Sequence, residues 1–134
     1  MSKKNILVIF GTRPEAIKLA PVIKELKRHP DAFNTTVCVT GQHREMLDQI
    51  LSFFEIVPDI DLNLMTHNQT LTELTAKILV EVDQVIKNGD YDYVVVQGDT
   101  TTVYASAVCA HYNKVKVIHV EAGLRSFDFD HPFP

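Results

Sequence analysis

Four polar clusters in the sequence contain residue types that can bind anions or move protons, and each directly follows a short apolar run. The clusters are Gly11–Glu15, Thr40–His43, Gln97–Thr100 and Glu121–Arg125. If the apolar runs are neighbouring parallel strands, all four clusters lie at one edge of one sheet, where open α/β folds build ligand sites. The sequence therefore predicts a single site at the carboxyl edge of a sheet.

The cluster Gly11–Glu15 has three features that suit an anionic group such as a diphosphate. Gly11 lets the backbone approach a ligand, the following helix offers N–H groups at its N-terminus, and Arg13 can donate two hydrogen bonds to phosphate oxygens. Lys18, one helical turn after Pro14, can add a second positive charge. The alternative is that Arg13 and Lys18 only pair with acidic side chains. The dinucleotide fingerprint Gly-x-Gly-x-x-Gly is absent from this cluster, which argues against such a cofactor.

Asp99 and Glu121 each follow an apolar strand and are candidates for a general acid and a general base. Burial and mutual repulsion move the pKa values of two neighbouring carboxylates apart, as acid and base catalysis requires. Asp99 has an alternative, structural interpretation as the cap of the following helix. Glu121 needs a polar partner, and Arg125 or His119 would serve as a purely structural one.

The elements expected to position these clusters alternate between strand and helix. Continuous β-branched runs such as Ile6–Phe10 suit strands that are covered on both faces. The order β-α-β-α-α-β-α-β predicts an α/β fold with a Rossmann-like, mostly parallel sheet, helices on both faces and right-handed crossovers. The expected strands are Asn5–Phe10, Thr36–Val39, Tyr93–Val96 and Val115–Val120. The expected helices run from Pro14 to just before Pro30, from about His43 to Phe54, from about Thr70 to Lys87, and onward from Thr100 or Thr101.

Apolar residues at helical spacing identify the faces that should pack against the sheet. The segment Ile56–Asn68 is expected to be a mobile connection between helices. The inward-facing residues expected in the second helix are Met46, Leu47, Ile50, Leu51 and Phe54. Those expected in the third are Leu71, Leu74, Ile78, Val82, Val85 and Ile86.

Length and composition indicate one domain of 134 residues that can bury an ordinary core. The net charge of −4, with no basic stripe, argues against nucleic acid as a partner. No membrane span or signal peptide is recognised, so a cytoplasmic protein is expected. Cys38 and Cys109 lack metal-type spacing and are expected to be buried thiols; neither a metal nor a cofactor is predicted.

The clusters and their flanking residues, taken in order, closely resemble the non-hydrolysing UDP-N-acetylglucosamine 2-epimerases of bacteria and archaea. The resemblance covers essentially the whole chain. It implies a GT-B-like fold of two Rossmann-like domains with a nucleotide sugar between them. Residues 1–134 are then the N-terminal domain, without the C-terminal nucleotide-binding domain. The segments that carry the resemblance are Gly11–Lys18, Thr40–Leu47, Gly98–Thr102 and His119–Arg125.

The resemblance also implies an activity and its residues. The family interconverts UDP-N-acetylglucosamine and UDP-N-acetylmannosamine for surface polysaccharide synthesis. It eliminates UDP to leave a 2-acetamidoglucal, and adds UDP back after a proton has returned to C2 from the other face. Asp99 and Glu121 match two catalytic carboxylates, and Arg13 and Lys18 match basic residues near the substrate phosphates. The full-length enzymes are usually homodimers.

The sequence departs from the family pattern at its end. In the family a third catalytic carboxylate, a glutamate, directly follows Pro-Phe-Pro, and this sequence stops at Pro134. The catalytic histidine and much of the uridine pocket belong to the second domain. We therefore expect residues 1–134 alone to have no epimerase activity and to bind the UDP-sugar weakly.

Some family members also bind a second UDP-N-acetylglucosamine as an activator, and Gln42 and His43 match residues of that site. Glu45 and Asn68 stand where activated members carry glutamine and arginine. Loss of that positive charge should weaken diphosphate binding by about 1 kcal/mol or more, so we expect little activation. Gln42 and His43 would then only orient their loop.

Three other functions fit the same architecture. A hydrolysing epimerase would release free N-acetylmannosamine, and a UDP-sugar glycosyltransferase would need an acceptor. A non-catalytic half-domain would instead bind a nucleotide sugar or a partner chain through its uncovered cleft face, and the surface that it exposes would favour association.

Overall fold

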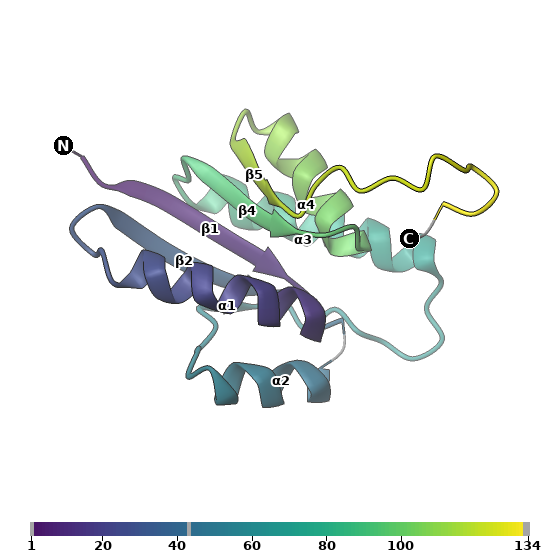
Figure 1. Ribbon diagram of the computed structural model, residues 1–134, viewed down its shortest axis with the longest axis horizontal. Helices are drawn as coiled ribbons and strands as arrows, with labels where there is room; N and C mark the ends of the chain where they lie inside the picture. Colours follow the sequence, from purple (N-terminus) through teal and green to yellow (C-terminus); the bar gives the residue numbers. More distant parts are fainter. Residues whose placement is uncertain (1, 43, 133–134) are drawn as a thin grey trace.

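The computed structural model describes residues 2–42 and 44–132. The chain has an α/β fold built on a parallel sheet (Figure 1). The strands lie in the order β3-β2-β1-β4-β5, and every neighbouring pair is parallel. The predicted Rossmann-like sheet is therefore confirmed, and its strand order reverses between β1 and β4. The elements are β1 (Lys4–Phe10), α1 (Arg13–Lys27), β2 (Phe33–Val39), α2 (Arg44–Phe53), β3 (Ile60–Asp61), α3 (Leu71–Asn88), β4 (Tyr93–Gln97), α4 (Thr101–Tyr112) and β5 (Lys116–Val120).

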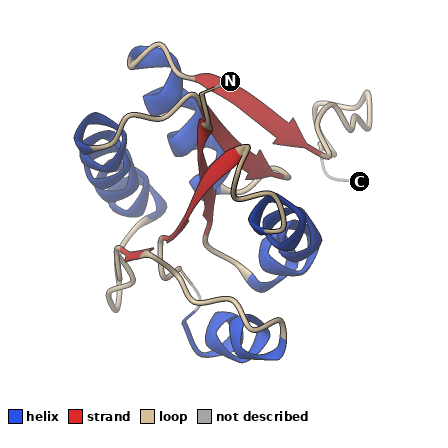
Figure 2. Cartoon of the chain, turned by 90° about the vertical axis from the view of Figure 1, so that its left-hand side faces the viewer, coloured by secondary structure: helices blue, strands red, loops and turns tan. Residues whose placement is uncertain are grey.

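Helices cover both faces of the sheet, as the continuous apolar strands predict (Figure 2). Side chains of β1 alternate between the two faces: Ile6, Val8 and Phe10 pack in one core cluster with residues of α1 and α2. Leu7 and Ile9 pack in the other cluster, with residues of α3 and α4. These five side chains are at most 3% exposed. The central strand thus belongs to two hydrophobic cores at once.

Side-chain caps fix where the helices begin. At α3, Thr70 and Glu73 form a capping box: the Thr70 N–H donates to Glu73 Oε2 at 2.8 Å and the Glu73 N–H donates to Thr70 Oγ1 at 3.1 Å. At α4 the cap is Thr100, whose Oγ1 accepts from the Val103 N–H at 3.3 Å. The alternative that Asp99 caps this helix is therefore wrong.

Two strand predictions need correction. β2 begins at Phe33, three residues before its predicted start, because its polar first half pairs with β1; there Asn34 Nδ2 donates to Asn5 Oδ1 at 2.9 Å. The segment Ile56–Asn68 is not only a connection, since it contains β3, which pairs with the end of β2. A strand of two residues is too short to have a recognisable hydrophobic period.

Two residues predicted to face inward are exposed. Met46 is 52% exposed and Leu71 is 67% exposed, because each lies in the first turn of its helix, before the turns that pack on the sheet. The two cysteines are buried free thiols, as predicted, and burial raises the pKa of Cys38 to about 12. Among the described residues, no helix combines the length and hydrophobicity needed to cross a membrane.

Two valines of α3 provide a matched test of this packing. Val82 is fully buried in the second core cluster, whereas Val80 on the same helix is 61% exposed. We expect Val82→Ala to lower the free energy of unfolding by roughly 2 kcal/mol, through lost burial and a cavity. Val80→Ala should change it by less than about 0.5 kcal/mol. Urea unfolding measures both, and equal effects would contradict this assignment of the buried face.

Candidate active site

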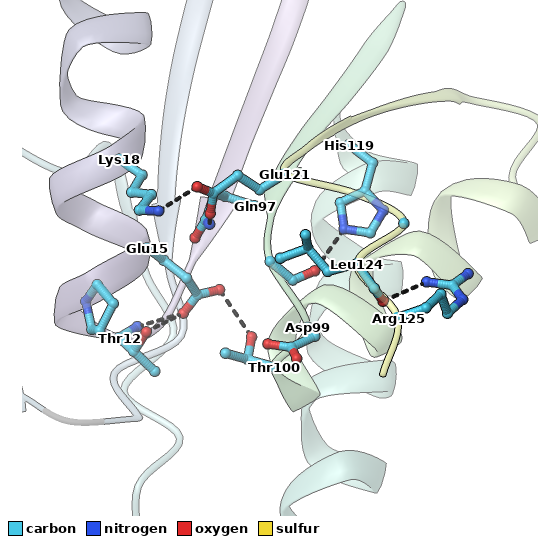
Figure 3. Close-up of a pocket in the computed structure, with 13 residues that line it drawn as sticks. Thr12, Glu15, Lys18, Gln97, Asp99, Thr100, His119, Glu121, Leu124 and Arg125 are labelled. Atoms are coloured by element: carbon cyan, nitrogen blue, oxygen red, sulfur yellow. Dashed lines mark hydrogen bonds and ion pairs between the residues drawn. The ribbon is translucent and has the colours of Figure 1, made fainter. Parts of the chain in front are cut away.

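A pocket of about 420 Å³ lies at the carboxyl ends of β4 and β5, beside the first turns of α1 (Figure 3). Lys18, Asp99 and Glu121, which the sequence places in one site, all line this pocket. Among residues 2–42 and 44–132, no three histidine, cysteine or acidic side chains are grouped so as to hold a metal ion. The titratable side chains in the wall of the pocket are Glu15, Lys18, Asp99, His119, Glu121 and Arg125.

Glu121 follows β5 and is held by two side chains from other elements. Lys18 of α1 forms an ion pair with Oε1, and Gln97, the last residue of β4, donates from Nε2 to Oε2 at 2.5 Å. The hydrogen bond from Lys18 is the main cause that lowers the pKa of Glu121 below its ordinary value of 4.5. Glu121 is therefore a charged carboxylate at neutral pH, able to accept a proton.

The two residues considered as structural partners of Glu121 form hydrogen bonds with other groups. His119 Nε2 donates to the carbonyl oxygen of Gly98 at 2.6 Å, and Arg125 Nη1 donates to the carbonyl oxygen of Leu124 at 2.8 Å. Both side chains line the pocket. Of the two basic residues proposed either to bind phosphate or to pair with acids, Lys18 does form an ion pair.

Asp99 lines the pocket with an exposed side chain. Thr100 caps α4, so Asp99 is not needed for that purpose. No hydrogen bond or ion pair to the Asp99 carboxylate is found within the part of the chain that the structure describes. Asp99 and Glu121 thus have different surroundings: both are exposed, but only Glu121 is paired with a cation.

Glu15 is the site residue that the sequence analysis missed. Glu15 is 1% exposed, and its Oε2 accepts from the N–H of Gly11 at 3.2 Å and from the N–H and Oγ1 of Thr12 at 2.8 and 2.6 Å. Oε1 accepts from Thr100 Oγ1 at 2.9 Å. The N–H groups of Gly11 and Thr12, which precede α1, are therefore bound by a side chain of the protein, and binding of a diphosphate by the N–H groups of the first helical turn stays a prediction. The spacing Thr-x-x-Glu, typical of a capping box, was the available signal.

Gly11 is required at the end of β1 because the backbone passes close to two buried threonines. A Cβ on Gly11 would lie 2.2 Å from Thr40 Oγ1 and 2.7 Å from Thr102 Oγ1. These hydroxyls lie 3.1 Å apart, and Thr102 Oγ1 also donates to Gln42 Oε1 at 3.3 Å. Gln42 thus contacts the buried Thr102 and is not one of the pocket's lining residues.

One predicted residue, Arg13, is not brought into the pocket wall, and another lies outside the described residues. Arg13, the first residue of α1, is exposed and is not among the lining residues. No ion pair to Arg13 is found among residues 2–42 and 44–132, so the alternative that it pairs with an acid is not supported. His43, predicted to belong to an activator site with Gln42, lies outside the described residues.

Replacing Lys18 with methionine should raise the pKa of Glu121 toward 4.5, because the main cause of its lowering is removed. A lowered folded-state pKa stabilises the fold fully above pH 4.5, and this stabilisation is lost as pH falls through the folded-state pKa. Lys18→Met should therefore lose less stability on acidification than the unmodified chain. Carboxyl carbon NMR titration and acid unfolding measure these effects. Lys24→Met, an exposed position in the last turn of α1, is the control. An unchanged pKa in Lys18→Met would contradict the pairing.

Sequence comparison identifies close relatives. The profile of the UDP-N-acetylglucosamine 2-epimerase family matches residues 24–134. A UDP-N-acetylglucosamine 2-epimerase of Salmonella borreze is 52% identical over all 134 residues, and one of Bacillus subtilis is 50% identical. In both comparisons the chain spans 35% of the relative's length.

Solved structures agree. The UDP-GlcNAc 2-epimerase of Neisseria meningitidis bound to UDP-GlcNAc superposes with a TM-score of 0.90 at 51% identity, over 97% of this chain and 35% of that one. The enzyme of Methanocaldococcus jannaschii in complex with UDP-GlcNAc and UDP gives 0.87 at 39% identity, over 94% of this chain and 34% of that one. The family profile matches well over half of the residues of this chain. The chain therefore belongs to the UDP-N-acetylglucosamine 2-epimerase family.

Proposed function

We propose that residues 1–134 form the N-terminal, Rossmann-like part of an enzyme that interconverts UDP-N-acetylglucosamine and UDP-N-acetylmannosamine. The observation that carries this proposal is the meeting of Asp99, Glu121 and Lys18 in one pocket, with the two carboxylates in different surroundings. Family membership and relatives solved with UDP-GlcNAc support the substrate class.

The reaction needs a base for the proton at C2, an acid on the opposite face of the sugar, and positive groups beside the departing diphosphate. Glu121 and Asp99 supply the two carboxylates, and either can be the base. Lys18 and Arg125 are cations in the pocket wall, and a bound diphosphate would compete with Glu121 for Lys18. Arg13 at the start of α1 would add a second phosphate contact.

The remaining parts of the enzyme would come from the rest of a full-length protein, since this chain spans about 35% of its relatives. We propose a GT-B-like second domain that closes the nucleotide site, and a cytoplasmic homodimer as the assembled form. The pocket wall holds three carboxylates, Glu15, Asp99 and Glu121, against the cations Lys18 and Arg125. A diphosphate adds further negative charge, so tight binding of the UDP-sugar needs positive groups from outside residues 1–134.

A full-length protein containing this segment should convert UDP-N-acetylglucosamine to UDP-N-acetylmannosamine and, in heavy water, place deuterium at C2. Asp99→Asn and Glu121→Gln should each lower kcat by about 10²- to 10⁴-fold, the usual range for loss of acid or base catalysis. The matched controls are Asp31→Asn and Glu81→Gln, which change exposed carboxylates outside the pocket and should leave kcat unchanged. Equal activity of the two sets would refute the assigned roles.

Product analysis separates the alternatives for the same full-length protein. Free N-acetylmannosamine released together with UDP would indicate a hydrolysing epimerase. Consumption of UDP-N-acetylglucosamine only when an acceptor is present would indicate a glycosyltransferase. If UDP-N-acetylglucosamine is not consumed and gains no deuterium at C2, the protein only binds the nucleotide sugar.

Residues 1–134 on their own should show no detectable epimerisation and only weak binding of UDP-N-acetylglucosamine. The physical reason is the excess of carboxylates in the pocket wall described above. Calorimetric titration and mass-spectrometric product analysis measure the two quantities, with the full-length protein as the positive control. Turnover by residues 1–134 would show that the site needs no second domain.

A further inference from the structure

We propose that Glu15 is a positioning residue that sets the place of Asp99 in the pocket, acting through Thr100. This inference rests on the proposed function. Its starting point is that the buried Glu15 carboxylate binds two loops from different parts of the chain, after β1 and after β4 (Figure 3).

The two oxygens of Glu15 have separate tasks. Oε2 accepts three hydrogen bonds from the turn after β1, which stabilises the start of α1. Oε1 accepts its bond from Thr100, 85 residues further along the chain. A capping box at α1 uses only the first of these tasks. The second bond holds α1 and the turn after β4 at a fixed separation.

Thr100 transmits this contact to Asp99. The same hydroxyl that donates to Glu15 Oε1 accepts from the Val103 N–H, so it ties the first turn of α4 to Glu15. Asp99 is the preceding residue, and no hydrogen bond or ion pair of its own side chain is found among the described residues. Its position in the pocket therefore depends on the backbone at Thr100.

This arrangement should affect the reaction step more than substrate binding. Lys18 lies one turn after Glu15 on α1, so the carboxylate also fixes the distance from Lys18 to Asp99. A displacement of about 1 Å can cost a catalytic group roughly 10²-fold in rate. Binding of the diphosphate depends on basic groups that a shift of Asp99 leaves in place. Loss of the bond between Glu15 and Thr100 should thus lower kcat and spare KM.

The decisive variants are Thr100→Val and Thr100→Ser in a full-length protein containing this segment. Valine keeps the shape and removes the hydroxyl, whereas serine keeps the hydroxyl. We expect Thr100→Val to lower kcat at least 10-fold with KM within about threefold of the unmodified enzyme, and Thr100→Ser to stay within about twofold in both. Rates are normalised to folded protein, because Thr100→Val also loses a helix cap. Equal kcat values in the two variants would overturn the proposal.

A double-mutant cycle tests whether Glu15 and Thr100 act as one unit. Glu15→Ala should lower kcat as Thr100→Val does, and combining them should lower it little further. Effects that multiply would mean that the two residues act independently and would refute the proposal.

Hydrogen exchange gives a readout that needs no activity. Glu15→Ala should speed amide exchange at least fivefold in residues 98–102 as well as at the start of α1. Faster exchange confined to α1 would mean that Glu15 only caps this helix, and would contradict the proposal. An inactive unmodified enzyme would refute the proposed function alone, because the exchange experiment still decides the role of Glu15.

Discussion

The central strand β1 is covered on both faces and paired along both edges, and this burial decides where polar groups can emerge. Val8 pairs with Val37 of β2 on one side and with Val95 of β4 on the other, and it is completely buried. Buried polar side chains need partners that such a strand cannot offer. The first polar cluster can therefore appear only where β1 ends, at Gly11, and the parallel neighbours end on the same side.

Beyond Gly11, polar contacts between loops take over from apolar packing. The hydroxyls of Thr40 and Thr102 meet beneath Gly11, where no side chain fits. Lys18 reaches from α1 to Glu121 after β5. Buried hydroxyls therefore join the chain segments beside Gly11, and an ion pair joins two residues of the pocket wall, with elements from both sides of the strand-order reversal.

The sequence predicted those features that depend on local pattern. Continuous apolar runs predicted the parallel sheet. The acidic residues that follow two of these runs predicted Asp99 and Glu121 as site residues, and both line the pocket. Patterns failed where distant contacts decide. The strand β3 forms because β2 offers an open edge, and the partners of Glu121 come from Lys18 and Gln97. The assigned chemical roles of these residues stay predictions.

The backbone at Glu121 indicates what its side chain contributes. Its φ is 55°, a left-handed conformation that favours glycine and costs a larger residue about 1 kcal/mol or more. A glycine would remove that cost, and Gly123, two residues on, does occupy such a conformation, with φ of 84°. The strain at Glu121 is offset by the contacts of its carboxylate with Lys18 and Gln97. Since the turn itself needs no carboxylate, this conformation supports the proposal that glutamate is present at this position for the charge that it places in the pocket.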